Sequence, residues 1–588
     1  MNLSKARFVD RKCIMRVEGE ICQTTDELLA SDLLAVVVGK FVKDLLTHQS
    51  PLLAIFGSKE VENDEIVNLI KVLQALGQKK FDQARLDIPE AESFFADPNL
   101  LNDFVEALYN YWRGFERFLV CYSDDVEGSD SATSPYRVFN ETSEKLTHLI
   151  RAAYRDIQLN ITGQRCRVYR QVFAGPQVGF IAVKKEWPCP DGPCEILRSV
   201  PMIRQVLLNP PLIIDPPTNK RTGSFQKVDS NPLEGMILDS DNWLCYPAKV
   251  GGLLVHIFFS DVFMELGCSL VNLFELANDD DLSRKPDAVY VFGAPGDDLY
   301  RYGPLPIVFF DDEKNDLLVG AVPDKREFGY FGYLKKMVLT LHNIKVMKQG
   351  RLPYHGAMVN VLLKNGASAT ILLIGDTGAG KSETLEAFRV LGHEHIRGLT
   401  IIADDMGSLA IGSDGELLGY GTEIGAFVRL DDLGPGFAFG QIDRAIIMSA
   451  HKVNARAIIP VTNMANVLKG YKVDYILYGN NYEVVDNENP VVESFSSCEE
   501  ALSVFRKGTV MAKGTTTASG IGHSYFANPF GPPQYRELHD NLAHQYFEAA
   551  FAQQIFVGQI RTRLGIPGWE STGPQESAKA LFSLISNQ

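Results

Sequence analysis

Long hydrophobic segments and a positive net charge are both missing from this 588-residue sequence. Its longest apolar run, Leu33–Gly39, falls far short of the roughly 20 residues that a membrane-crossing helix needs. The opening residues, MNLSKARFVDRKC, lack the apolar core of a signal peptide. The formal charge of −16 argues against non-specific binding to nucleic acid, which needs a basic surface. These absences predict a cytoplasmic protein with neither a membrane span nor a nucleic-acid partner.

Clustered cysteines are missing as well. The nine cysteines are scattered and odd in number, a pattern typical of free thiols in a reducing compartment. Cys189 and Cys194 are the only close pair, and no second pair at matching spacing completes a metal site. Hydrophobic residues make up 45% and charged residues 22% of the chain, which is ordinary for a globular protein.

Three regions of different character follow one another along the chain and predict an α/β protein with three domains. In residues 1–160, segments such as DELLASDLLAVVVGKFVKDLL and LNDFVEALYNYWRGFERFLV repeat apolar residues at helical spacing, which predicts a helical N-terminal region. Residues 161–325 alternate β-rich runs with Pro/Gly turns, which predicts a mixed α/β domain on the substrate side. Residues 326–588 contain buried-strand runs such as ATILLIG and LTIIAD, and carry the motifs that follow.

A glycine-rich loop between an apolar strand and a helix is the most specific motif of the sequence. It fits G-x-x-x-x-G-K-[ST] and consists of Gly375, Asp376, Thr377, Gly378, Ala379, Gly380, Lys381 and Ser382. The backbone N–H groups of such a loop close around phosphate oxygens, and the helix N-terminus adds a favourable dipole. Lys381 is expected to neutralise the β- and γ-phosphates, and Ser382 to bind the Mg²⁺ that accompanies ATP. The motif predicts phosphoryl transfer.

An acidic pair follows the loop at the end of another apolar strand, LTIIA. Asp404 and Asp405 supply carboxylate oxygens, the ligands that hard cations prefer. Beside a phosphate loop, the pair predicts a site for Mg²⁺ or Mn²⁺.

Residues upstream of the loop are not needed by an ordinary phosphate-loop enzyme. Tyr330 precedes the pair Lys335–Lys336 in YFGYLKK, and His355 follows Lys336 by 19 residues. With the loop and Asp405, this order resembles the phosphoenolpyruvate carboxykinase family, especially its ATP-dependent branch. The resemblance implies that Lys336, His355 and Asp405 bind Mn²⁺ and that Tyr330 lies against a substrate carboxylate.

Two downstream segments extend the resemblance. Glu423 opens EIGAFVR, which is similar to the family's E-G-G-x-Y-A-K and implies a role for Glu423 beside the nucleotide. Arg456 lies in NARAIIP, which is similar to N-T-R-x-x-Y-P and implies a phosphate-contacting arginine. The segment Ala527–Gly531, ANPFG, is similar to a Phe-Gly turn of the family. The resemblance covers a little under half of the chain and implies a carboxykinase-type nucleotide domain over residues 326–588.

The activity implied by this resemblance is the conversion of oxaloacetate and a nucleotide to phosphoenolpyruvate and CO₂ with Mn²⁺ and Mg²⁺. The residues implied in catalysis are Lys336, Lys381, Arg456 and Tyr330. The nucleotide could be ATP, GTP or pyrophosphate.

Departures from the family keep alternatives open. GDTGAGKSET and IIADD are also similar to HPr kinase/phosphorylase, which phosphorylates a protein serine. The family's oxaloacetate-binding G-R-S-P-K-D-K segment has no copy, and the nearest basic loop holds Lys220 and Arg221. Ser519–Gly522 lacks the arginine of the family's nucleotide-contacting R-G-I-T. The alternatives are a kinase with a protein or small hydroxyl acceptor, and a nucleotide-sensing protein.

Overall fold

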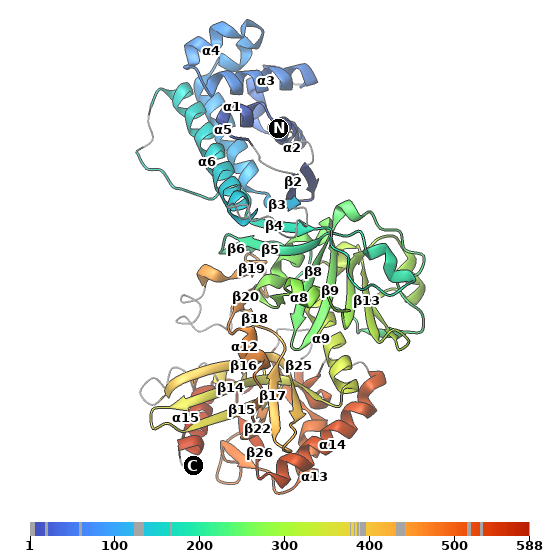
Figure 1. Cartoon of the computed structure of the whole chain (residues 1–588). Helices are drawn as coiled ribbons and strands as arrows, with labels where there is room; N and C mark the ends of the chain where they lie inside the picture. The colour runs from blue at the N-terminus through green and yellow to red at the C-terminus, as the bar shows by residue number, and fades with distance from the viewer. Residues whose placement is uncertain are drawn as a thin grey trace. The chain divides into compact units, whose positions relative to one another are not determined.

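A computed structural model of the chain describes residues 6–17, 22–57, 61–122, 135–164, 167–376, 378–381, 383–384, 387, 396–430, 442–513, 519–529 and 533–586. The fold is mixed α/β, and the chain divides into two compact units (Figure 1). The first unit comprises Met1–Lys185 and Pro201–Asn209, and the second comprises Glu186–Val200 and Pro210–Gln588. The division into three domains stays a prediction. Among the described residues, no helix has the length and apolar character needed to cross a bilayer.

The first unit combines five strands with a layer of helices. Its strands lie in the order β1 (Ala6–Val9), β2 (Lys12–Val17), β3 (Glu116–Tyr122), β4 (Val178–Val183) and β5 (Met202–Leu208). The pairs β2–β3 and β3–β4 are parallel, so each needs a helical crossover. The helices are α1 (Thr25–Leu29), α2 (Asp32–Thr47), α3 (Asn63–Leu76), α4 (Phe81–Asp87), α5 (Pro98–Arg113) and α6 (Pro135–Thr162).

Two details of the expected helical region are wrong. The first expected helix is broken, because the Ser31 side chain accepts from the backbone N–H of Leu34 and so starts α2 anew. The segment FERFLV forms most of strand β3 instead of continuing α5. Helix α5 ends at Gly114, whose N–H donates to the last free carbonyls, and the following residues pair with β2 and β4. The apolar spacing of this segment continues past Gly114, although the helix itself stops there.

Seven strands of the second unit form the surface on which helix α9 packs. They are β8 (Trp243–Val250), β9 (Leu253–Ser260), β11 (Ala288–Ala294), β13 (Leu317–Pro323), β12 (Val308–Asp312) and β7 (Gln226–Val228), with β10 (Glu275–Leu276) beside β8. Short helices α7 (Met264–Cys268) and α8 (Asp279–Leu282) lie between these strands in the chain. Helix α9 (Phe331–Lys348) packs on β11 and β13 and is buried on almost every side.

The second sheet carries the glycine-rich loop. Its eight strands lie in the order β21 (Tyr471–Lys472), β17 (Leu417–Gly421), β16 (Ile396–Ile411), β14 (Leu352–Leu363), β15 (Ser368–Ile374), β22 (Tyr475–Asn480), β26 (Phe556–Arg561) and β23 (Val492–Ser494). Apolar side chains from β14, β15, β22 and β26 form its core with helix α15 (Thr572–Ser586). Helices α12 (Met464–Leu468), α13 (Cys498–Lys507) and α14 (Arg536–Ala552) complete the described helices of this part.

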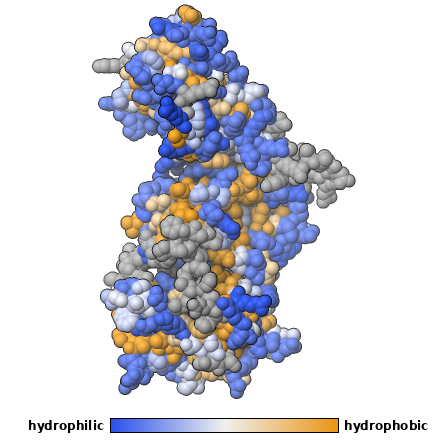
Figure 2. Space-filling view, turned by 90° about the vertical axis from the view of Figure 1, so that its left-hand side faces the viewer, coloured by the Kyte–Doolittle hydropathy of each residue, from blue (hydrophilic) through white to orange (hydrophobic). Residues whose placement is uncertain are grey.

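Two smaller sheets complete the second unit. One contains β18 (Gly425–Arg429), β20 (Arg456–Pro460), β19 (Ile446–Met448) and β6 (Leu212–Ile214), and the other is the hairpin β24 (Thr509–Lys513) with β25 (Ser519–His523). The face in Figure 2 presents hydrophobic residues scattered among hydrophilic ones.

The pairing of β6 with β19 brings two distant parts of the chain together. Ile214 lies opposite Met448, 234 residues later, and both strands lead into the site.

Candidate functional site

Asp405 is the residue around which the predicted metal ligands meet. It lies on β16 opposite Gly356 of β14, one residue beyond His355. Its Oδ1 lies 2.8 Å from Nε2 of His355, and its Oδ2 accepts from the Nζ of Lys335 at 2.6 Å. The backbone of Asp405 has a φ of 112°, which an L side chain rarely adopts and which costs on the order of 1–3 kcal/mol. The two charge-assisted contacts offset that cost and fix the carboxylate.

The ring of His355 has a defined orientation. Its Nδ1 bonds to the backbone carbonyl of Ala527, which can only accept, so Nδ1 carries the hydrogen. Nε2 is therefore the nitrogen that could ligate a metal, and it is the one that faces Asp405. A carbonyl that fixes the tautomer in this way is the usual second partner of a metal-binding histidine.

Lys335 is fully buried between two carboxylates. Besides Asp405, its Nζ lies 3.5 Å from Oε1 of Glu423, whose other oxygen accepts from Thr422. Burial disfavours the charge of Lys335, but Asp405 and Glu423 outweigh it and raise the pKa of the lysine above its ordinary value. Burial opposes ionisation of Asp405 as well, yet Lys335 and His355 hold its pKa well below the usual range. Burial raises the pKa of Glu423.

Lys336, the next residue of α9, is half-buried and lies among charges of both signs. Burial lowers its pKa to about 8. The negative charges of Asp405 and Asp376 act against that shift, and the positive charges of Arg221 and Lys335 add to it. An amine whose pKa is lowered in this way can offer a lone pair to a metal. The pKa of Lys336 therefore responds to the charges of Asp405 and of Asp376, the second residue of the glycine-rich loop.

The glycine-rich loop is joined directly to the histidine strand. The N–H of Gly375 donates to the backbone carbonyl of His355 at 3.1 Å. The Nζ of Lys381 donates to the carbonyls of Gly375 at 2.5 Å and Asp376 at 3.1 Å, and the side chain is buried. In this arrangement the lysine is held by the loop's own carbonyls, which a phosphate would replace.

Side chains from two later strands support the loop from behind. Asn481 donates to the carbonyl of Gly378 at 2.9 Å, and Thr562 donates to the carbonyl of Ala379 at 2.8 Å. Gly380 has a φ of 88°, and a Cβ there would lie 2.7 Å from the Thr562 side chain. The glycine is therefore required both by its backbone conformation and by the close approach of Thr562.

Asp404 belongs to the loop side of the site. Burial raises its pKa, as does the charge of Asp405, while Lys335 and Lys381 lower it. Its charge thus interacts with Lys335 and with Lys381 of the glycine-rich loop. Two residues assigned to the loop in the sequence, Thr377 and Ser382, lie outside the described residues.

Tyr330, Arg456 and Lys335 lie around the ring of Phe427. Tyr330 is the N-cap of α9 and is buried, and its ring centroid lies 6.2 Å from that of Phe427. The guanidinium of Arg456 lies 5.4 Å from the same centroid and Nζ of Lys335 lies 5.8 Å from it. Burial raises the pKa of Tyr330, whereas the charges of Arg456, Lys335 and Arg221 lower it, so all three cations act on this hydroxyl.

The loop that carries Arg221 is fixed by hydrogen bonds. The hydroxyl of Tyr333, on α9, accepts from the N–H of Thr222 at 2.9 Å. Asn454, two residues before Arg456, donates to the carbonyl of Asn219 at 2.7 Å. Burial lowers the pKa of Arg221. The basic loop noted in the sequence is therefore held beside the lysine helix by contacts on both sides.

Sequence reasoning left several of these partners without a role. Lys335 was noted only as half of a lysine pair, although it is the lysine that contacts Asp405. The Ala527 carbonyl was noted only as part of the ANPFG turn, and Phe427 only as part of EIGAFVR. Glu423 was assigned to the nucleotide, and the partners found for it are Lys335 and Thr422; its nucleotide role stays a prediction.

In comparisons with known proteins, no family model matches the chain, and no curated protein matches it significantly. Among the described residues, no three His, Cys, Asp or Glu side chains are grouped so that they could hold a metal ion. The predicted Mn²⁺ site differs from such a group in taking an amine, that of Lys336, as its third ligand.

Proposed function

We propose that the chain is a carboxykinase-like phosphotransferase that converts oxaloacetate and a nucleoside triphosphate to phosphoenolpyruvate, CO₂ and the diphosphate. One observation carries the proposal. His355 contacts Asp405 through its side chain and the glycine-rich loop through its backbone, while Lys336 lies within the charge of both Asp405 and Asp376. These contacts support a single site that would combine the predicted metal ligands with the predicted phosphate loop.

The donor set of this site fits a divalent cation. An imidazole nitrogen of fixed tautomer, a carboxylate and an amine with a lowered pKa are nitrogen and oxygen ligands of the kind that Mn²⁺ accepts. When bound, Mn²⁺ at Lys336, His355 and Asp405 would polarise the substrate's carbonyl oxygen, and Mg²⁺ would screen the phosphates.

The chain's own cations have separate tasks in this reaction. Lys381 would exchange the carbonyls of Gly375 and Asp376 for phosphate oxygens. Arg456, oriented by Asn454 at 3.1 Å, would stabilise the charge on the phosphoryl group in transfer. Arg221 and Tyr330 would bind the substrate carboxylate, which otherwise would be buried without a partner at a cost of several kcal/mol.

The test is a phosphoenolpyruvate assay with oxaloacetate, Mn²⁺ and Mg²⁺, supplied in turn with ATP, GTP and pyrophosphate. We expect His355→Ala to abolish product formation. The matched control is His544→Ala, because His544 is an exposed histidine of α14 paired with Glu499, and this variant should keep full activity. Arg221→Gln should raise the KM for oxaloacetate at least tenfold and leave the KM for nucleotide unchanged.

A parallel screen of hydroxyl acceptors with γ-labelled nucleotide separates the alternatives. Label transfer to a hydroxyl acceptor, with no phosphoenolpyruvate from any donor, would refute the carboxykinase reaction in favour of a kinase. Nucleotide binding without transfer to any acceptor would favour a sensor.

A further inference from the structure

The helical layer of the first unit contains an apolar cavity that takes no part in the proposed chemistry. It has a volume of about 100 Å³ and is lined by side chains from α1, α2, α3, α5 and α6. Apart from the tyrosines Tyr109 and Tyr154, its lining consists of Leu, Val, Ile, Ala and Trp side chains. A cavity of this lining gives water few partners and is better filled by an apolar group.

A pair of stacked tyrosines closes one side of the cavity. The rings of Tyr109 on α5 and Tyr154 on α6 lie parallel, with centroids 4.0 Å apart. The hydroxyl of Tyr154 donates to the carboxylate of Glu106, which also accepts from Gln158 at 3.2 Å and Asn110 at 3.2 Å. The carboxylate of Glu106 is therefore hydrogen-bonded by three neutral donors.

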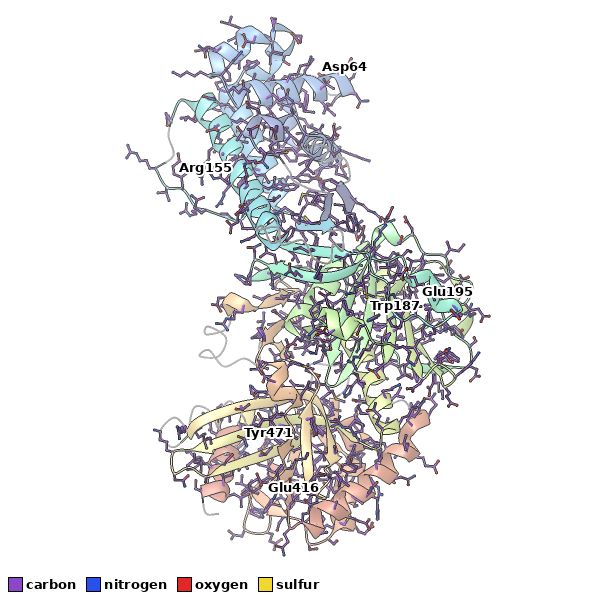
Figure 3. All side chains as sticks on the ribbon, in the orientation of Figure 1. Asp64, Arg155, Trp187, Glu195, Glu416 and Tyr471 are labelled. Atoms are coloured by element: carbon purple, nitrogen blue, oxygen red, sulfur yellow. The ribbon has the colours of Figure 1, made fainter. Side chains whose placement is uncertain are left out.

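Three arginines lie on the two helices that carry this tyrosine pair. Arg113 follows Tyr109 by one turn on α5 and lies over its ring, 5.8 Å from the centroid. Arg151 and Arg155 are one turn apart on α6, the helix on which Figure 3 labels Arg155. The charges of all three act on the Tyr109 hydroxyl: burial raises its pKa, and each arginine lowers it.

The hydrogen-bond partners of these arginines are neutral. Arg151 and Arg155 share the side-chain carbonyl of Gln171, at 2.9 Å and 3.1 Å, and Arg113 donates to Asn110 at 3.3 Å. Within the part of the chain that the structure describes, none of the three forms an ion pair with a carboxylate. Guanidinium groups without a carboxylate partner, on two of the helices that line an apolar cavity, are complementary to a molecule with one anionic end.

We propose that this cavity binds a free carboxylic acid with an aliphatic chain of about six carbons, its chain in the cavity and its carboxylate against Arg151 and Arg155. The volume sets the length, because a protein cavity of about 150 Å³ holds benzene. A slightly smaller cavity with an open side takes four or five carbons inside and the rest at the mouth. The site belongs to the first unit, so it is independent of the function proposed for the second.

Calorimetry on the full chain tests this, with hexanoate and hexan-1-ol as probes. Hexanoate should bind at least tenfold more tightly than hexan-1-ol. From butanoate to hexanoate, affinity should rise about fourfold for each added CH₂, the factor that matches about 0.8 kcal/mol for its burial. Beyond the length that fills the cavity, the rise should stop.

Two variants and one control separate the contribution of the ligand's aliphatic part from that of its carboxylate. R151Q/R155Q should remove the preference for hexanoate and leave hexan-1-ol binding unchanged. A153F fills the cavity from the buried position Ala153 and should abolish binding of both probes. R85Q is the matched control, because Arg85 is an exposed arginine of α4 paired with Glu92, and it should bind like the wild type.

Equal binding of acid and alcohol by the wild type, or the same loss of binding in R85Q as in R151Q/R155Q, would overturn the proposal. If circular dichroism shows that A153F does not fold, R151Q/R155Q decides the matter alone, since its changes lie on the half-buried face of α6 and leave the cavity lining intact.

Discussion

Lys335→Met should destabilise the second unit far more than an equivalent change on the same helix. The substitution leaves the partly buried carboxylate of Asp405 and the buried carboxylate of Glu423 without the ammonium that lies 2.6 Å and 3.5 Å from them. Breaking a buried ion pair by removing one partner costs about 3–5 kcal/mol. The second unit has roughly 390 residues, and unfolding entropy near 2.1 cal/mol/K per residue converts this cost to a fall in Tm of about 4–6 °C.

The helix offers its own control. Lys345 lies ten residues further along α9, is also buried, and pairs with Asp316 at the same 2.6 Å. Asp316, however, is 75% exposed, so water replaces the lost ammonium. Lys345→Met should therefore cost no more than about 1 kcal/mol and shift Tm by about 1 °C.

A second substitution tests the mechanism of the loss. Glu423→Gln removes one of the two carboxylates, so the double variant Lys335→Met/Glu423→Gln should regain part of the stability lost in Lys335→Met. Differential scanning calorimetry is run on five proteins: the wild type, Lys335→Met, Lys345→Met, Glu423→Gln and the double variant. The transition of the second unit gives the coupling between Lys335 and Glu423. Equal Tm shifts for Lys335→Met and Lys345→Met, or strictly additive shifts in the double variant, would refute the reasoning.

Other predictions follow from the loop and from buried histidines. Lys381→Ala should abolish turnover and weaken nucleotide binding in calorimetry, because the cation that meets the phosphates is removed; unchanged affinity would contradict the loop assignment. Gly380→Ala should also abolish nucleotide binding, since the new Cβ meets the Thr562 side chain. Burial lowers the pKa of His256 to about 3 and of His342 and His539 to about 4, from 6.5. The unfolded chain then binds more protons as pH falls from about 6.5 to 4, and each histidine costs on the order of 3 kcal/mol of stability by pH 4.

Controls for these variants come from the chain itself. Gly366→Ala matches Gly380→Ala in backbone strain, because Gly366 has a φ of 92°, but its added Cβ meets nothing within 4 Å. It should lower stability slightly and leave nucleotide binding intact. For the pH dependence, thermal unfolding between pH 7.5 and 4.5 should show a falling Tm, and His539→Gln should make that fall shallower. A Tm that is constant over this range would contradict the burial argument.

Local sequence was enough for β15, the strand that precedes the glycine-rich loop, because its apolar run is a strong signal. The expectation that a strand ends at Asp404 and Asp405 is wrong: β16 continues to Ile411, so the acidic pair lies within the strand. Local sequence did not show where that strand stops. It was not enough to choose between Lys335 and Lys336. Successive residues of a helix point about 100° apart, and only the packing of α9 against its neighbours decides which ammonium reaches Asp405. The carbonyl that orients His355 comes from Ala527, 172 residues later, and no local pattern links the two.

The charge arrangement of the site supports an anionic substrate in a chain whose total charge is −16. Lys335 is neutralised by Asp405 and Glu423 inside the protein, so it is not available to a ligand. Lys381 is held by backbone carbonyls and Arg456 by a neutral asparagine, so neither has to leave a carboxylate in order to bind phosphate. An ammonium or guanidinium that exchanges a neutral acceptor for an anion gains electrostatic energy, whereas one that leaves an ion pair gains little. In the proposed reaction, Lys381 and Arg456 would therefore exchange neutral acceptors for phosphate, and Lys335 would stay between its two carboxylates.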